Sequence, residues 1–168
     1  MAYVIDEDYN QLPPPPTRAA VEADLVDWRH RLTDLVKQLS SWSQEVPGID
    51  CVIAETEMLE PKMQMVGINT PFSLPMLLID KLPAERAGSP PMRFAANRAP
   101  DYGWLSIWPD ARWVIGTRGQ VWLQSEEFFE TLVDIGTPGA PDWRFTQHGE
   151  FLRPLTRDSF QNIIKSLR

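Results

Sequence analysis

An apolar residue recurs every three or four positions along residues 17–43, TRAAVEADLVDWRHRLTDLVKQLSSWS. The recurring residues are Val21, Leu25, Trp28, Leu32, Leu35, Leu39 and Trp42. This period predicts an α-helix of about 40 Å with one apolar stripe. A four-proline run at residues 13–16 precedes it, Thr17 is a suitable N-cap, and Pro47-Gly48 ends the region.

The stripe has two interpretations. Val26 and Val36 widen it, which favours packing on a sheet in the chain's own core. The same spacing also fits about three coiled-coil heptads, so a homodimer through residues 17–43 is the alternative.

After the helix, the sequence pattern favours strands and turns. Residues 50–59 alternate in the period of two that a strand requires. Further strands are expected at 62–69, 74–80, 104–108, 112–116, 119–124 and 143–145. Two helices are expected near the end, one over 126–136 capped by Ser125 and one that begins after Thr156.

These elements predict an α+β fold, in which a long N-terminal helix and two C-terminal helices pack on an antiparallel meander sheet of about five to seven strands. Residues 17–168 are expected to form a single domain, since 168 residues suffice for one core and the chain shows no linker. Residues 1–16 are expected to form a flexible proline-rich tail.

The net charge of −7 is uneven, because residues 1–60 hold twelve acidic and four basic residues. Phosphate backbones and anionic lipids repel such a chain, so we expect no binding to duplex nucleic acid or to a membrane. An acidic surface suits a basic protein partner instead. The lone Cys51 allows no internal disulfide and the start resembles no signal peptide, so a cytoplasmic location is expected.

The segment 104–124 contains four of the seven tryptophans. If Ser106 faces Trp113 and Trp113 faces Trp122, one sheet face holds the aliphatic residues Leu105, Ile107, Val114, Val121 and Leu123. The other face then holds Trp104, Trp108, Trp113 and Trp122 among Ser106, Gln120 and Gln124. Such a half-polar aromatic surface suits protein contact or stacking, unless a helix covers it.

No motif indicates catalysis, a metal site or a cofactor. Cys51 has only His30 and His148 as candidate bases, and neither lies at a spacing typical of metal ligands. Glu55 and Glu57 share one side of a strand, an arrangement that a solvated face explains better than acid–base chemistry. The expected catalytic, metal and cofactor assignments are therefore none.

The leading hypothesis is a non-catalytic protein-binding module, such as an inhibitor, an immunity-type protein or an adaptor. It uses the tryptophan face and the acidic N-terminal third. The alternative is a small-ligand-binding domain with an aromatic pocket, in which Arg86, Arg93 or Arg98 on a lid loop meets an anionic group. An enzyme with an unrecognised site is the third hypothesis.

Overall fold

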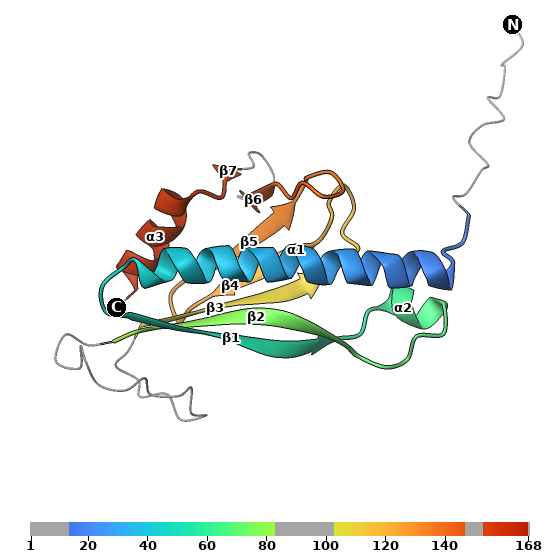
Figure 1. The fold of residues 1–168 in the computed structure, drawn as a ribbon, viewed down its shortest axis with the longest axis horizontal. Coiled ribbons are helices and arrows are strands. Elements are labelled where there is room, and N and C mark those ends of the chain that lie inside the picture. Colours follow the sequence, from blue (N-terminus) through green and yellow to red (C-terminus); the bar gives the residue numbers. More distant parts are fainter. Residues whose placement is uncertain (1–13, 83–102, 147–152, 168) are drawn as a thin grey trace, which may run out of the picture.

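A computed structural model describes residues 14–82, 103–146 and 153–167 (Figure 1). Within these ranges the strands form one antiparallel sheet in the order β1-β2-β3-β4-β5-β6-β7, so each strand pairs with its neighbour in sequence. The elements are α1 (Arg18–Gln44), β1 (Ile49–Met58), α2 (Pro61–Met65), β2 (Phe72–Lys81), β3 (Trp104–Ala111), β4 (Gln120–Gln124), β5 (Phe129–Asp134), β6 (Trp143–Thr146), β7 (Arg153–Pro154) and α3 (Arg157–Ser166). The expected α+β class with a meander sheet is confirmed. Within the described ranges there is one C-terminal helix, not two.

Helix α1 forms as its sequence predicts. Thr17 adopts an extended conformation, and its hydroxyl accepts a hydrogen bond from the Ala20 amide at 3.2 Å. The stripe residues from Val21 to Leu39 are at most 2% exposed. The stripe is therefore part of the chain's own core, which was the first of its two interpretations.

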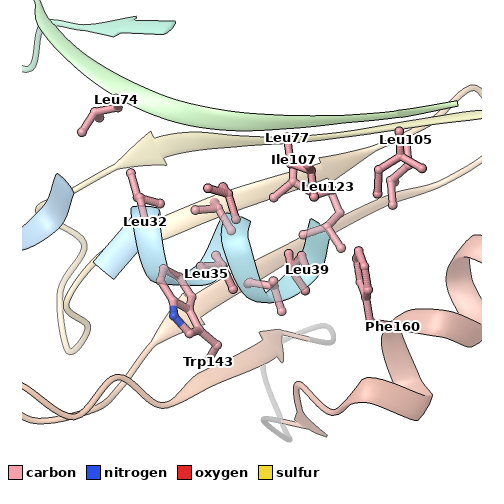
Figure 2. Packing of buried hydrophobic residues seen from close by; sticks show 14 of the residues in the cluster. Leu32, Leu35, Leu39, Leu74, Leu77, Leu105, Ile107, Leu123, Trp143 and Phe160 are labelled. Carbon is pink, nitrogen blue, oxygen red and sulfur yellow. The ribbon is translucent and has the colours of Figure 1, made fainter. Parts of the chain in front are cut away.

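All the packing of α1 is on one face of the sheet (Figure 1). Figure 2 shows Leu77, Ile107 and Leu123 gathered between the strands and the turn of α1 that carries Leu35 and Leu39. Helix α3 begins at the predicted cap Thr156, whose hydroxyl accepts from the Ser159 amide at 3.1 Å. Its Phe160 lies 6.3 Å from the ring of Trp42, so α3 extends the cover that α1 provides.

Two predicted elements have the wrong type. Residues 126–136 were expected to be a helix, but the Ser125 amide donates to the Phe128 carbonyl and the chain returns as β5, paired with β4 from Gln124↔Phe129 to Gln120↔Val133. The hydrogen bonds that these residues form with the edge of β4 outweigh their weak preference for a helix. Residues 62–69 were expected to be a strand, but Pro61 begins the short helix α2, whose Met63 is buried.

The expected strand at 112–116 is also absent. β3 pairs directly with β4, and the register shifts between Pro109 and Ala111. Beyond this irregularity the side chain of Arg112 is buried beneath α1, and its backbone amide donates to Glu60 Oε1 at 2.6 Å. Residues 112–118 are therefore held by side-chain contacts instead of a strand ladder. The segment 143–145 forms a strand as expected, within β6. The two-residue β7 pairs with its other edge and is the last strand of the sheet.

A buried ion pair joins α1 to the far strands. Arg31 is 3% exposed and Asp134 is fully buried, and Arg31 Nη1 donates to Asp134 Oδ2 at 2.6 Å. Arg31 also donates to Asp27 Oδ2 at 2.7 Å and to the Thr137 carbonyl at 2.8 Å. The other oxygen of Asp134 accepts from the amides of Gly136 and Asp142. Each nitrogen of the Arg31 guanidinium and each oxygen of Asp134 makes a hydrogen bond, and these bonds offset the cost of burying the two charges.

Replacing Asp134 by alanine should destabilise the chain by about 3–5 kcal/mol, since it leaves a buried guanidinium without its main partner. Urea denaturation of the wild type and Asp134→Ala measures this loss. The double variant Arg31→Met/Asp134→Leu should recover a large part of it, because no buried charge remains. If Asp134→Ala unfolds at the wild-type urea concentration, α1 does not depend on this pair.

Gly119 lies against the six-membered ring of Trp28, which is fully buried. A Cβ at position 119 would overlap that ring, and the backbone there has φ +140°. Trp28 in turn lies 5.9 Å from the ring of Trp143. The glycine therefore lets the chain approach an indole that links α1 to β6.

Gly119→Ala should cost about 1–3 kcal/mol or more, because the overlap forces Trp28 to move. The matched control is Gly139→Ala, where φ is +75° but nothing lies within 4 Å of the added Cβ. That control should lose only the roughly 1 kcal/mol of a left-handed backbone. Thermal and urea unfolding compare the two, and an equal loss would show that the contact with Trp28 is unimportant.

Candidate functional site

The face of the sheet that points away from α1 is the candidate site, and we call it the outer face. On β3 and β4 the buried Leu105, Ile107, Val121 and Leu123 alternate with partly exposed residues. Their burial confirms the predicted aliphatic face, except that Val114 lies outside the strands. The central part of the outer face, on β2 to β5, includes Met76, Leu78, Trp104, Ser106, Trp108, Asp110, Gln120, Trp122, Gln124, Phe129 and Thr131. No described helix packs against it.

Three aromatic side chains form a continuous row on the outer face. Trp108 and Trp122 are direct cross-strand partners, with ring centroids 5.7 Å apart and an edge-to-face angle of 74°. Phe129 continues the row at 5.5 Å from Trp122 and is 57% exposed. Cross-strand aromatic pairs of this geometry contribute about 0.5–1.5 kcal/mol beyond the area they bury. The row is therefore already formed in the free chain.

Polar groups lie beside this aromatic row. Asp110 accepts a hydrogen bond from Gln120 Nε2 at 2.7 Å and another from the Trp122 side chain. Burial raises the pKa of Asp110 above its ordinary value, although these two hydrogen bonds lower it. The Trp108 indole N–H is buried and has no acceptor among the described residues. The surface thus combines a desolvated carboxylate with an unsatisfied donor.

The predicted site residues are only partly brought together. Trp104, Trp108 and Trp122 share the outer face as expected, with Trp104 opposite Asp80 and Ser106 opposite Gln124. The expected facing of Ser106 with Trp113, and of Trp113 with Trp122, is wrong. Arg86, Arg93 and Arg98 of the expected lid loop, and His148, lie outside the described residues.

Trp113 is on the α1 side of the sheet. Its indole N–H donates to Asp24 Oδ2 at 2.9 Å, and Lys62 Nζ lies 5.2 Å from the ring centroid. It lines a shallow hollow of about 290 Å³ with Asp24, Arg112 and Arg118. The Arg112 guanidinium is already bonded to Asp24, to Asp27 and to the Arg118 carbonyl. The charge of Arg112 is therefore already satisfied within the chain.

Cys51 and Glu55, which were considered for catalysis, contact neighbouring side chains of the fold. Cys51 is half-buried against α1, with its Sγ 3.3 Å from Ser40 Oγ. Glu55 is paired with Arg29 at 3.2 Å and also accepts from the Ser73 hydroxyl. No group of three metal-ligating side chains occurs within the described ranges.

Sequence reasoning missed Asp110 and Phe129 as site residues. Asp110 fell between the expected strands 104–108 and 112–116, and Phe129 fell in the expected helix 126–136, so neither was assigned to a sheet face. The signal was present in Trp108-Pro109-Asp110, where an unbroken period of two would have placed Asp110 beside Trp108.

No protein-family model, curated protein or solved structure matches this chain. No described helix is both long enough and apolar enough to cross a lipid bilayer. Proposals about function therefore rest on the residues and their geometry.

The raised pKa of Asp110 predicts a pH effect on stability. The folded chain holds this proton more tightly than the unfolded chain, so folding is favoured below the ordinary aspartate pKa of about 3.9 and loses that advantage as pH rises through the raised value. Asp110→Asn removes the titration while keeping the shape. The variant should therefore gain stability relative to wild type as pH increases over this range.

Urea unfolding of both proteins at about pH 3, 5 and 7 measures the difference. The comparison is between variants because burial also raises the pKa of Glu60, and the charge of Asp110 adds to that rise. Asp110→Asn therefore removes this repulsion of Glu60 together with the titration of Asp110. A stability difference that does not change with pH would show that Asp110 titrates normally.

Proposed function

We propose that this chain is a non-catalytic protein-binding module, and that the outer face receives a protein partner with basic residues around an apolar centre. The observation that carries the proposal is the row Trp108, Trp122 and Phe129, held edge-to-face on a sheet face that no described helix covers. Tryptophan is the residue most enriched at the centres of protein interfaces. We place the module in the cytoplasm, consistent with its single cysteine.

Charge on the outer face supports a basic partner. Asp110 lies beside the row, and Asp50 lies at the β1–β2 end of the same face. The basic residue described on this face is Arg144, which is ion-paired with Asp142 at 3.0 Å. Lysine or arginine at the rim of a partner would meet this carboxylate excess, which mainly raises the rate and specificity of association.

The Trp108 indole supports a specific contact at the centre. A buried N–H without an acceptor costs about 1–3 kcal/mol relative to one that is hydrogen-bonded. The N–H is shielded in the free chain, so a carbonyl or carboxylate oxygen of the partner accepts this hydrogen bond only when the Trp108 side chain turns its N–H toward the partner. The outer face would then gain both apolar burial and one satisfied donor on binding.

A homodimer through α1 has less support. Its stripe is used in the core, and the exposed side of the helix offers Val26, which is 52% exposed, among charged residues. The small-ligand alternative would need the arginines at 86, 93 and 98, whose positions are not described. No observation supports the homodimer or the small-ligand-binding domain as directly as the aromatic row supports a protein-binding surface.

Trp122→Ala and Trp108→Ala should each weaken the partner complex by about 2 kcal/mol or more, a loss typical of interface hot spots. Ile115→Ala is the matched control, because Ile115 is fully exposed and lies outside the sheet. The four tagged proteins are used to capture partners from the native source lysate at low and high salt, with thermal unfolding measured alongside.

A stoichiometric partner that binds wild type and Ile115→Ala, is lost from Trp122→Ala, and leaves at high salt supports the proposal. Trp108→Phe separates the two contributions, since it keeps a ring and removes the N–H. If the tryptophan variants lose stability and binding in equal measure, the indoles serve the fold and the outer face is not the binding surface.

A further inference from the structure

Among the described strands, none pairs with the outer edge of β1. Strand β1 is ten residues long and lies at the end of the strand order, paired on one side with β2 from Ile49↔Lys81 to Met58↔Phe72 without a register shift. No described strand pairs with its other side, and Figure 1 shows it along the margin of the sheet. The opposite margin ends in the two-residue β7, which is too short to extend the ladder far.

The direction of each backbone group on β1 follows from one hydrogen bond. The Leu82 amide donates to the Gly48 carbonyl at 2.7 Å, and these two residues continue the β1–β2 register. In an antiparallel ladder, alternate residues bond to the same neighbour. Asp50, Val52, Ala54 and Thr56 therefore bond to β2, whereas the N–H and C=O groups of Ile49, Cys51, Ile53, Glu55 and Glu57 point off the open margin.

The side chains at the centre of this margin are apolar and accessible. Val52 is 40% exposed on the outer face, and Ile53 is 46% exposed on the face that carries α1. β1 contains neither proline nor lysine and no bulge, which are common devices that protect an edge strand. A strand added beside β1 would accept hydrogen bonds from its outward N–H groups and donate hydrogen bonds to its outward C=O groups. It would also shield apolar side chains on both faces of the sheet.

The charge of β1 indicates what kind of strand fits. Its charged residues are Asp50, Glu55 and Glu57, and it has no basic residue. A second copy paired antiparallel through β1 would bring six carboxylates to one seam, and Arg29 compensates only Glu55. Like charges across a ladder are destabilising, whereas opposite charges stabilise it.

We propose that the open margin of β1 binds an extended segment of a partner protein as an added strand, and that this segment carries lysine or arginine beside aliphatic side chains. The backbone of Ile49, Cys51 and Ile53 supplies the hydrogen bonds. The acids of β1 favour a basic segment over a second copy of this chain. The proposal does not depend on the outer face, because its contacts are made in the plane of the sheet.

Amide hydrogen exchange tests the proposal on the full chain. The probe is a capped peptide of about eight residues that alternates lysine with valine and threonine, the length of a typical strand. In the absence of peptide, the amides of Val52 and Ala54 should be protected and those of Cys51 and Ile53 should exchange fast. The peptide should slow exchange at Cys51 and Ile53 by about fivefold or more, since they become hydrogen-bonded. A peptide with glutamate in place of lysine should have a much smaller effect.

Two variants at one position provide the controls. Ile53→Pro removes an outward N–H that β2 does not use, so it should keep the fold and abolish the effect of the peptide. If the proline variant fails to fold, Ile53→Lys takes its place as the control. It puts a positive charge at an accessible position and should therefore repel the lysine peptide. Trp122→Ala should leave the peptide effect intact, so a failure here is distinguishable from a failure of the outer face.

Three outcomes would overturn the proposal. The first is fast exchange at Cys51 and Ile53 that millimolar lysine peptide does not change. The second is equal slowing by the glutamate peptide, which would remove the argument from charge. The third is protection of the Cys51 and Ile53 amides in the absence of peptide. Protection that grows with protein concentration would mean that a second copy occupies the margin. Protection that does not depend on concentration would mean that the margin is closed within one chain.

Discussion

Burial of the α1 stripe against one face of the sheet, with β1 and β2 nearest to the helix and β3 and β4 in the same core, is the constraint on which the rest of the structure depends. The six stripe residues from Val21 to Leu39 are almost inaccessible, and burying a large apolar side chain is worth about 1.5–3 kcal/mol. A helix is roughly 10 Å wide and strands are about 4.8 Å apart, so α1 alone covers only two or three strands. Phe160 of α3 and Trp143 and Phe145 of β6 complete the cover at the other end. All of this apolar cover lies on one face of the sheet.

The same packing redistributes the charge of the chain. At least five of the nine acids in residues 14–60 are ion-paired with arginines, including Asp24 and Asp27 with Arg112 and Glu45 with Arg157. The acidic N-terminal third is therefore not simply an acidic surface. Part of its charge joins α1 to the segments 112–118 and 153–167. The carboxylates left for recognition are fewer and more localised than the sequence suggests.

One-sided cover leaves two surfaces of different chemistry. The outer face offers a row of aromatic side chains in edge-to-face contact, a desolvated carboxylate at Asp110 and the unsatisfied N–H of Trp108. The margin of β1 offers backbone donors and acceptors flanked by Val52 and Ile53. A partner on the face is recognised by its side chains, whereas a strand at the margin is recognised mainly through its backbone. Because the face and the margin meet at β1, one partner with an extended arm could contact both.

The sequence by itself determined the elements whose periods are long or whose caps are explicit: α1 with its stripe, β1, and α3 behind Thr156. It also predicted the aliphatic and aromatic sides of β3 and β4, since alternation alone assigns them. It could not determine the register, because β3 continues through Pro109 to Ala111, where a break between two strands was expected, and then pairs directly with β4. That difference moved Trp113 to the α1 side and brought Trp108 opposite Trp122. Residues 126–136 fit a helical period, and only pairing with β4 made them a strand. Local periodicity shows which side of a helix or strand is apolar. Strand partners, register and ion pairs such as Arg31–Asp134 join residues that are distant in sequence, so only the tertiary structure determines them.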